Sequence, residues 1–377
     1  MNQRLLSLDA FRGFTIAAML LVNNPGDWGH LYAPLAHAKW DGWTFTDCIF
    51  PFFVFISGVS MTLSLGRRAA AGDSKLRLLM HTLQRGAIII VIGLLLNFIP
   101  AFDLQTLRIP GVLQRLGLCA MLAAPIVLYG SWRAHLTWLV GLLVVYTSIQ
   151  TTVSVPDALG VWRTGSLLPG EDVGAWLDRV LMDGHLWRTS KTWDPEGLLS
   201  TLPALASQLA GVLAGHWLAT TRTPLNKTKA LLVAGTALLC AGQLLGAWSL
   251  PINKNLWTPA YVLFMAGWSC IVLGTLYGLL DATANADLRK KTITLTTPLQ
   301  IFGMNALFLF ALSGLIAKML GFVKNGAGQS LKATLYAPIQ SWGWAPESAS
   351  LVFAMVFTLC MYGVAWGMWR KGWFIKV

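Results

Sequence analysis

The stretch TFTDCIFPFFVFISGVSMTLSLG (residues 44–66) decides the fold. It is mostly apolar, and about 20 such residues are enough for an α-helix to cross the hydrocarbon core of a bilayer. The whole chain of 377 residues is 55% hydrophobic and only 12% charged, whereas an ordinary soluble domain carries about 25% charged residues. Because backbone polar groups inside lipid must be satisfied internally, such a run predicts a membrane-spanning helix.

Other apolar runs precede and follow this one, and together they predict ten spans. The expected ranges are roughly 6–23, 44–66, 86–101, 109–129, 135–153, 197–219, 229–249, 258–280, 298–321 and 349–370. We therefore expect an all-α polytopic membrane protein, with a bundle of about ten transmembrane helices forming a single domain over residues 1–377. The first run is expected to be retained as a span, because Asp9 and Arg12 interrupt it and no small-residue cleavage site follows.

Lysine and arginine residues in the connections predict the orientation of these spans. If the N-terminus is cytoplasmic, that side carries 16 basic residues and the opposite side carries nine. The positive-inside rule then places both termini in the cytoplasm and the loops near 24–43, 154–196 and 322–348 on the other side. The formal charge of +12 is explained by this topology, so the lipid bilayer is the expected partner and nucleic acid is not.

Groups that can transfer a proton gather in NNPGDWGHLYAPLAHAKWDGWTFTDCIFP (residues 23–51), where His37 is followed by Asp41 and Asp47. A histidine beside carboxylates is a candidate general acid or base, and Trp40 can shield it from water. A lone histidine is nevertheless more often structural, and Asp47 at a helix start can simply cap free N–H groups. The alternative for Asp47 is to orient the histidine or to pair with a substrate amine.

Charged residues inside the predicted spans are functional candidates, because each costs at least about 2.5–3.5 kcal/mol near the bilayer centre. Asp9 and Arg12 are three residues apart and can pair on one face of a helix. Arg115 must face the bundle interior, where it can hold a carboxylate such as Asp47 or an anionic ligand group; pairing within the protein is favoured. The five cysteines lie in apolar runs without a CxxC pair, so we expect buried small side chains and no metal site.

The long connection 154–196 is acidic. Its seven carboxylates suit a cationic ligand such as an amine, although a solvated loop is the more common explanation. They are Asp157, Glu171, Asp172, Asp178, Asp183, Asp194 and Glu196.

Several blocks of sequence carry a family resemblance. They include LDAFRG (8–13), HAKWDGWTFTDCIFPFFVFISG (37–58), RIPGVLQRLG (108–117), PINKNLWTPAYV (251–262) and the terminal WFIKV, in order over nearly the whole chain. The sequence thereby resembles the transmembrane acyltransferase family of heparan-α-glucosaminide N-acetyltransferase, and we expect a bacterial member of the NagX type.

The resemblance implies a membrane acetyltransferase that moves an acetyl group from cytoplasmic acetyl-CoA to the amine of a glucosamine-type sugar on the other side, without a metal. By motif, the family's active-site histidine falls on His37 and its nearby asparagine on Asn23. Basic residues at the cytoplasmic mouth match Arg4, Arg85 and Lys376, which suits the phosphates of acetyl-CoA. Asp41 stands where the lysosomal enzyme has asparagine, which affects the choice of acceptor.

Three groups of site residues are thus predicted. The catalytic residues are His37, Asn23 and Asp47; the donor-binding residues are Arg4, Arg85 and Lys376; the acceptor-binding residues are Asp41, Trp40 and Arg115. His37 is expected either to deprotonate the amine or to carry the acetyl group for one step. The alternative function is an amino-sugar permease. We also expect the bacterial inner membrane as the location and a possible homodimer.

Overall fold

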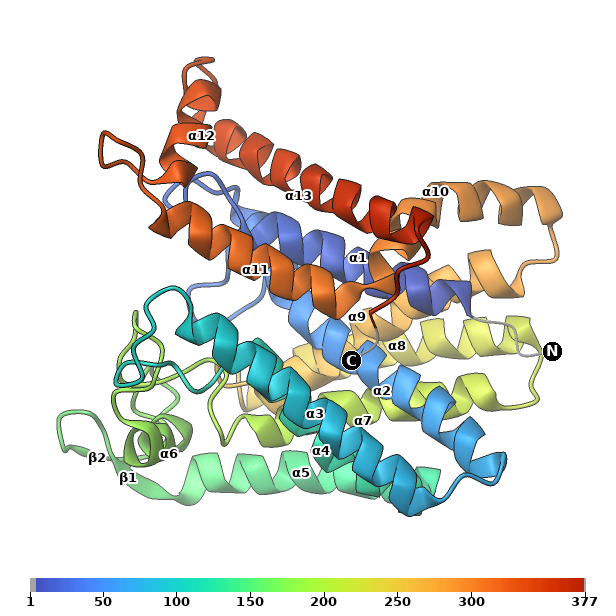
Figure 1. Ribbon diagram of the computed structural model, residues 1–377. Coiled ribbons are helices and arrows are strands. Elements are labelled where there is room, and N and C mark those ends of the chain that lie inside the picture. Colours follow the sequence, from blue (N-terminus) through green and yellow to red (C-terminus); the bar gives the residue numbers. More distant parts are fainter. Residues whose placement is uncertain (1–4, 376–377) are drawn as a thin grey trace.

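Long helices lying side by side form the body of the protein (Figure 1). The computed structural model describes residues 5–375. Its helices are α1 (Leu6–Asn23), α2 (Phe45–Ala70), α3 (Lys75–Phe98), α4 (Val112–Tyr129), α5 (Trp132–Thr152), α6 (Val173–Met182), α7 (Thr201–Ala219), α8 (Pro224–Trp248), α9 (Pro259–Tyr277), α10 (Ala286–Met304), α11 (Ala306–Phe322), α12 (Leu331–Gln340) and α13 (Pro346–Arg370). A short antiparallel hairpin pairs β1 (Ser154–Pro156) with β2 (Trp162–Thr164).

All ten apolar ranges predicted from the sequence fall on helices. Within residues 5–375, eight helices are long and apolar enough to cross a membrane, and the bent pair α10–α11 makes up to nine. Helix α7, the predicted span 197–219, lies outside this set. The prediction also placed the starts of two helices too late, because α3 begins at Lys75 and α10 at Ala286.

The bundle has two ends, which we name by their connections. The His37 end carries the segments 24–44, 99–111, 153–200 and 249–258 (Figure 1). The third of these segments contains the β-hairpin and α6. The opposite end carries the short connections 71–74, 130–131, 220–223 and 283–285. Most of the chain's irregular structure therefore lies at the His37 end, where it can build a site.

Glycines allow helices α2 and α7 to approach closely. A Cβ atom at Gly211 would lie 2.0 Å from the carbonyl oxygen of Phe55, and one at Gly58 would lie 2.0 Å from that of Gln208. Helices α1 and α10 meet in the same way, because a Cβ at Gly13 would lie 1.6 Å from the carbonyl oxygen of Leu299. Small residues at such crossings are typical of membrane helix pairs.

Replacing Gly211 with valine is expected to lower the thermal unfolding midpoint of the purified protein by several degrees, because the new side chain collides with backbone that cannot move aside. Gly141→Val is the matched control, since nothing lies within 4 Å of a Cβ there. Equal midpoints for the two variants would show that the α2–α7 contact does not require a small residue.

Helices α10 and α11 are bent by 73° at the break between them, the geometry of a broken span or of a re-entrant loop. Asn305 lies in the break and is buried. Its amide nitrogen donates to the carbonyl oxygen of Trp373 (3.0 Å), and its amide oxygen accepts from the backbone N–H of Ile375 (2.9 Å). The segment after α13 is thereby held against the break.

Two smaller predictions have different outcomes. The predicted pair on α1 is confirmed, with Arg12 Nη1 3.3 Å from Asp9 Oδ1. The prediction for the cysteines is wrong for two of the five, because Cys240 and Cys360 are exposed on α8 and α13 while the other three are buried. Membership of an apolar run does not determine which helix face a side chain occupies.

Candidate active site

The candidate site is built around the start of helix α2. Thr44 and Asp47 form a capping box, in which the backbone N–H of Thr44 donates to Asp47 Oδ2 at 3.0 Å. The Thr44 hydroxyl also contacts Asp47 Oδ2 at 3.1 Å. A threonine followed three residues later by an acidic residue is the local sequence pattern for this cap. The cap therefore fixes the carboxylate at the helix start.

The second oxygen of the same carboxylate holds His37. Asp47 Oδ1 lies 2.7 Å from His37 Nδ1, and the backbone N–H of Ala38 donates to Asp47 Oδ2 at 3.0 Å. The Asp47 side chain is 1% exposed and that of His37 is 48% exposed. With Nδ1–H donated to Asp47, the tautomer leaves Nε2 as the free base nitrogen. A half-exposed imidazole oriented by a buried carboxylate can accept a proton from a ligand in solution.

Helix α9 and the loop before it complete the surroundings of Asp47. The buried hydroxyl of Tyr261 donates to the backbone carbonyl oxygen of Asp47 at 2.6 Å. The ammonium of Lys254 lies 3.6 Å from Asp47 Oδ1, 3.1 Å from His37 Nδ1 and 3.4 Å from His37 Nε2. Sequence reasoning missed Lys254 as a site residue and counted it only as a basic residue in a loop. The one feature of the sequence that could have indicated Lys254 is its place within PINKNLW, one of the blocks that carry the family resemblance.

The predicted acceptor-binding residues occupy different environments. Asp41 is exposed, and its Oδ1 accepts from the side-chain amide of Asn253 at 3.0 Å. The indole N–H of Trp40 donates to the carbonyl oxygen of Leu167 at 2.8 Å, and its ring meets Trp193 edge-on at 5.1 Å. Both residues thus help to shape the His37 end, and their contact with a ligand stays a prediction.

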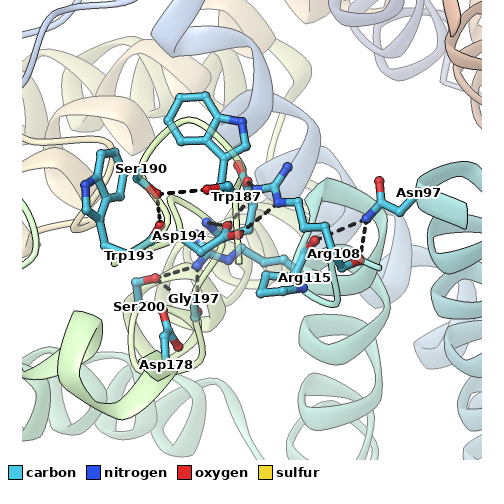
Figure 2. A network of polar contacts seen from close by, with 12 residues as sticks. Asn97, Arg108, Arg115, Asp178, Trp187, Ser190, Trp193, Asp194, Gly197 and Ser200 are labelled. Atoms are coloured by element: carbon cyan, nitrogen blue, oxygen red, sulfur yellow. Dashed lines mark hydrogen bonds and ion pairs between the residues drawn. The ribbon is translucent and has the colours of Figure 1, made fainter. Parts of the chain in front are cut away.

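Arg115 is buried within the protein, and its contact with a ligand stays a prediction. It is 1% exposed, and its Nη2 donates to the carbonyl oxygen of Gly197 at 2.8 Å and to the hydroxyl of Ser200 (Figure 2). The expected pairing with Asp47 is wrong, since no ion pair joins the two in residues 5–375. The ring of Trp257 lies 5.2 Å from the guanidinium, and within residues 5–375 the Nε and Nη1 atoms of Arg115 have no hydrogen-bond partner.

A neighbouring arginine holds the acidic loop together (Figure 2). Arg108 binds both oxygens of Asp194, at 2.8 and 2.6 Å, and contacts Glu196 Oε2 at 2.6 Å. Burial alone would raise the pKa of Glu196, but Arg108 and Arg115 reverse this and hold the pKa below its ordinary value. Burial raises the pKa of the nearby Asp178 carboxyl to about 7.

The acidic loop is therefore not an open anionic surface. Asp172, Asp178 and Asp194 are each at most 5% exposed, and the Glu196 side chain is 8% exposed. These four carboxylates belong to the internal structure of the His37 end, so the expectation of a solvated loop is wrong for them. That they bind a cationic ligand stays a prediction.

A cavity of about 710 Å³ opens between α1, α2, α3, α4, α7 and the break between α10 and α11, beyond the His37 site. Arg12, Arg85, Ser57 and Ser60 contribute polar groups to its wall, and so does Gln208. Along α2 the lining begins at Phe53, which is six residues, or about 9 Å of helix rise, from Asp47. The cavity therefore approaches His37 and Asp47 from inside the bundle.

Gln208 is unusual among the residues that line the cavity. It is 0% exposed, and within residues 5–375 neither its amide nitrogen nor its amide oxygen has a hydrogen-bond partner. A buried polar group without a partner costs about 1–3 kcal/mol. Such a group is well suited to a ligand that supplies the missing partner.

The remaining predicted residues lie at the edges of these sites. Asn23 is the last residue of α1 and is exposed, and its side chain makes no hydrogen bond to His37 or Asp47 among the described residues. Arg85 lines the cavity. Arg4 and Lys376 lie outside the described residues, although Ile375, the residue before Lys376, lines the cavity.

Comparison with known proteins identifies the family. The family model described as "Heparan-alpha-glucosaminide N-acetyltransferase, catalytic" matches residues 4–257. The chain belongs to the heparan-alpha-glucosaminide N-acetyltransferase family. It is 30% identical to the protein of that name from Homo sapiens over 363 residues, and the match covers 81% of this chain and 52% of the human one. For the Mus musculus protein the identity is 30% over 367 residues, covering 81% of this chain and 53% of the relative.

The chain spans about half the length of these curated relatives. The stretch matched by the heparan-alpha-glucosaminide N-acetyltransferase model contains His37, Asp47, Arg85 and Lys254. The predicted family resemblance is thus confirmed, and the NagX-type subgroup stays a prediction. Family membership and the apolar helices together identify an integral membrane protein.

Proposed function

We propose that this protein is a membrane acetyltransferase that moves an acetyl group from acetyl-CoA to the amine of a glucosamine-type sugar. The observation that carries the proposal is the contact of His37 Nδ1 with the buried Asp47 carboxylate at 2.7 Å, together with a cavity that Arg12 and Arg85 line and whose lining on α2 begins six residues after Asp47. The printed name of the curated relatives supports an N-acetyltransferase that acts on a glucosaminide.

The cavity is the proposed binding site for the donor. Arg85 and Arg12 line it together with hydroxyl groups, which suits an elongated ligand that carries phosphates at one end and amides along its length. Arg4 and Lys376 are proposed to add positive charge at the mouth. The opposite end of the bundle is then the cytoplasmic one, and the acetyl thioester points toward His37.

The chemistry begins with proton transfer to His37. Its Nε2 removes a proton from the sugar ammonium, and Asp47 stabilises the imidazolium that forms. The freed amine attacks the thioester carbonyl carbon, the C–S bond breaks, and the imidazolium returns its proton to the departing thiolate. The nitrogen of the new amide then loses its second proton to the neutral His37, which releases it to solvent. Asn23 is the proposed hydrogen-bond donor to the oxygen that becomes negative during attack. In the other route, His37 accepts the acetyl group before the amine does.

The acceptor is proposed to enter from the His37 end, which then faces away from the cytoplasm. Asp41 and Trp40 are proposed to contact the sugar, because an exposed carboxylate and an indole are common recognition groups for amino sugars. The location in a bacterial inner membrane, the single domain over residues 1–377 and a homodimer are proposed on the sequence grounds given above.

Purified protein in detergent tests the proposal. It should form N-acetylglucosamine from glucosamine and acetyl-CoA, detected by mass spectrometry. The competing function is an amino-sugar permease. Uptake of glucosamine into vesicles without acetyl-CoA, combined with no acetyl transfer to any amino sugar in detergent, would favour the permease.

Gln208→Leu tests the role of the cavity. We expect this variant to be at least as stable as the wild type without ligand, because it removes a buried amide that has no partner. Its KM for acetyl-CoA should rise about tenfold, the value of one hydrogen bond of roughly 1.4 kcal/mol, and the thermal stabilisation by acetyl-CoA should shrink.

Gln300→Leu is the matched control for this experiment. Gln300 is also buried, but its amide already donates to the Thr296 hydroxyl at 3.0 Å and it lies outside the cavity lining. Its substitution should lower stability and leave the KM for acetyl-CoA unchanged. An unchanged KM in Gln208→Leu would remove Gln208 from the donor site.

A further inference from the structure

Lys254 has no role in the mechanism above, yet it makes close contacts with His37 and Asp47. Its Nζ lies 3.1 Å from His37 Nδ1, 3.4 Å from His37 Nε2 and 3.6 Å from Asp47 Oδ1. The Lys254 side chain is only 16% exposed. A cation is thus held against the imidazole ring and largely out of water.

The loop that carries Lys254 is fixed on both sides. Asn253 is 0% exposed, and its amide oxygen accepts from the backbone N–H of Leu256 at 2.9 Å. Its amide nitrogen donates to Asp41 Oδ1 at 3.0 Å, and the backbone N–H of Gly42 donates to the carbonyl oxygen of Ile252 at 2.7 Å. The loop therefore pairs with the segment between His37 and α2, and the position of Lys254 is set by this pairing.

The geometry excludes a hydrogen bond from the Lys254 ammonium to His37 Nδ1. His37 Nδ1 is 2.7 Å from Asp47 Oδ1 and carries the proton in that contact. An ammonium has only donors, so it cannot form a hydrogen bond with a nitrogen that is itself donating. Nε2 keeps its lone pair and lies 3.4 Å from the ammonium, which can donate to it only while the ring is neutral. The positive charge also lies close to the whole imidazole.

The charges of Asp47 and Lys254 act on His37 in opposite directions. Asp47 favours a protonated His37, whereas a positive Lys254 disfavours it. Burial lowers the pKa of Lys254, while Asp47 and Glu196 act against this and favour its charged form; Arg115 adds to the lowering. Without Lys254, the negative charge of Asp47 would act on the ring unopposed.

We propose that Lys254 is a positioning residue whose positive charge keeps His37 neutral before the reaction, so that Nε2 keeps the lone pair that accepts a proton. The inference rests on the proposed function for its catalytic meaning. The effect on His37 itself is a physical property that can be measured without any acetyl transfer.

The pH dependence of His37 modification by diethyl pyrocarbonate measures this property, because the reagent attacks only neutral imidazole. Peptide mass spectrometry gives the rate at His37 for each pH. Lys254→Met should move the midpoint of the rate curve upward by about one pH unit, since a unit charge at this separation has that effect even in a medium as polar as water. Lys254→Arg should keep the wild-type midpoint.

His30 serves as an internal control in the same samples. It also contacts a carboxylate, with Nδ1 2.7 Å from Asp27 Oδ2, and its side chain is 48% exposed like that of His37. Its midpoint should not change in Lys254→Met. An unchanged His37 midpoint in Lys254→Met, in protein with the wild-type unfolding temperature, would overturn the inference; if that variant fails to fold, Lys254→Gln is measured instead.

Measurements of acetyl transfer separate the proposed function from the proposed role of Lys254. In an active wild type, the acid limb of the kcat/KM profile should shift upward by the same amount in Lys254→Met and return in Lys254→Arg. A wild type without acetyl transfer overturns the proposed function, while the His37 midpoint still decides the role of Lys254. An active wild type with an unshifted acid limb in Lys254→Met overturns the inference alone.

Discussion

His37→Ala should lower kcat for acetyl transfer by at least about 10²-fold, and by up to about 10⁴-fold if His37 acts only as a general base. The variant loses the group that accepts the proton, and in the acyl-carrier route it loses the group that is acetylated. Thermal stability should change little, because the side chain is 48% exposed. The measurement is initial-rate formation of N-acetylglucosamine by purified wild-type and variant protein.

His30→Ala is the matched control for this substitution. It removes a histidine from the same loop, with the same exposure of 48% and the same carboxylate distance of 2.7 Å. Its activity should stay within about twofold of the wild type, because the ordinary effect of a surface substitution is small. Equal losses in the two variants would mean that the loop matters for folding and that His37 has no special chemistry.

Asp47→Asn should also lower kcat by about 10²-fold or more, for a different reason. An amide is close in shape to the carboxylate, but it carries no charge to stabilise the imidazolium and it can favour the wrong tautomer of His37. KM for acetyl-CoA should change little, because Asp47 lies away from the cavity lining. Both constants come from the same initial-rate assay.

Stability separates the catalytic role of Asp47 from its structural one. Asp47→Asn keeps an oxygen for the cap, whereas Asp47→Ala removes the acceptor for the N–H groups of Ala38 and Thr44 and should lose about 1–2 kcal/mol of stability. Asp27→Asn is the control, since Asp27 is the partner of His30. Full activity in Asp47→Asn would show that Asp47 only caps helix α2 and has no role in catalysis.

The sequence was informative where the decisive contacts are local. His37 and Asp47 are ten residues apart, and the pattern Thr44-x-x-Asp47 is a capping signal that can be recognised without a structure. The apolar runs predicted all ten helical ranges because segment hydrophobicity is itself a local property. The exact starts of α3 and α10 were missed, since polar residues extend those helices beyond the lipid-facing part.

Contacts between distant segments could not be predicted in the same way. Lys254 is 217 residues from His37, and nothing in the spacing of either residue links them. Arg108 is 86 residues from Asp194, so an internal ion-pair cluster looked like a surface loop. Arg115 was correctly expected to point inward, but its partners are a backbone carbonyl and a hydroxyl, which a search for opposite charges does not find.

Transfer across a vesicle membrane tests the central claim most directly. Purified protein is reconstituted into liposomes that contain glucosamine, and labelled acetyl-CoA, which does not cross lipid, is added outside. We predict labelled N-acetylglucosamine inside the vesicles for the wild type and none above background for His37→Ala. Glucosamine that leaves or enters the vesicles unmodified, with no labelled product from the wild type, would contradict the account.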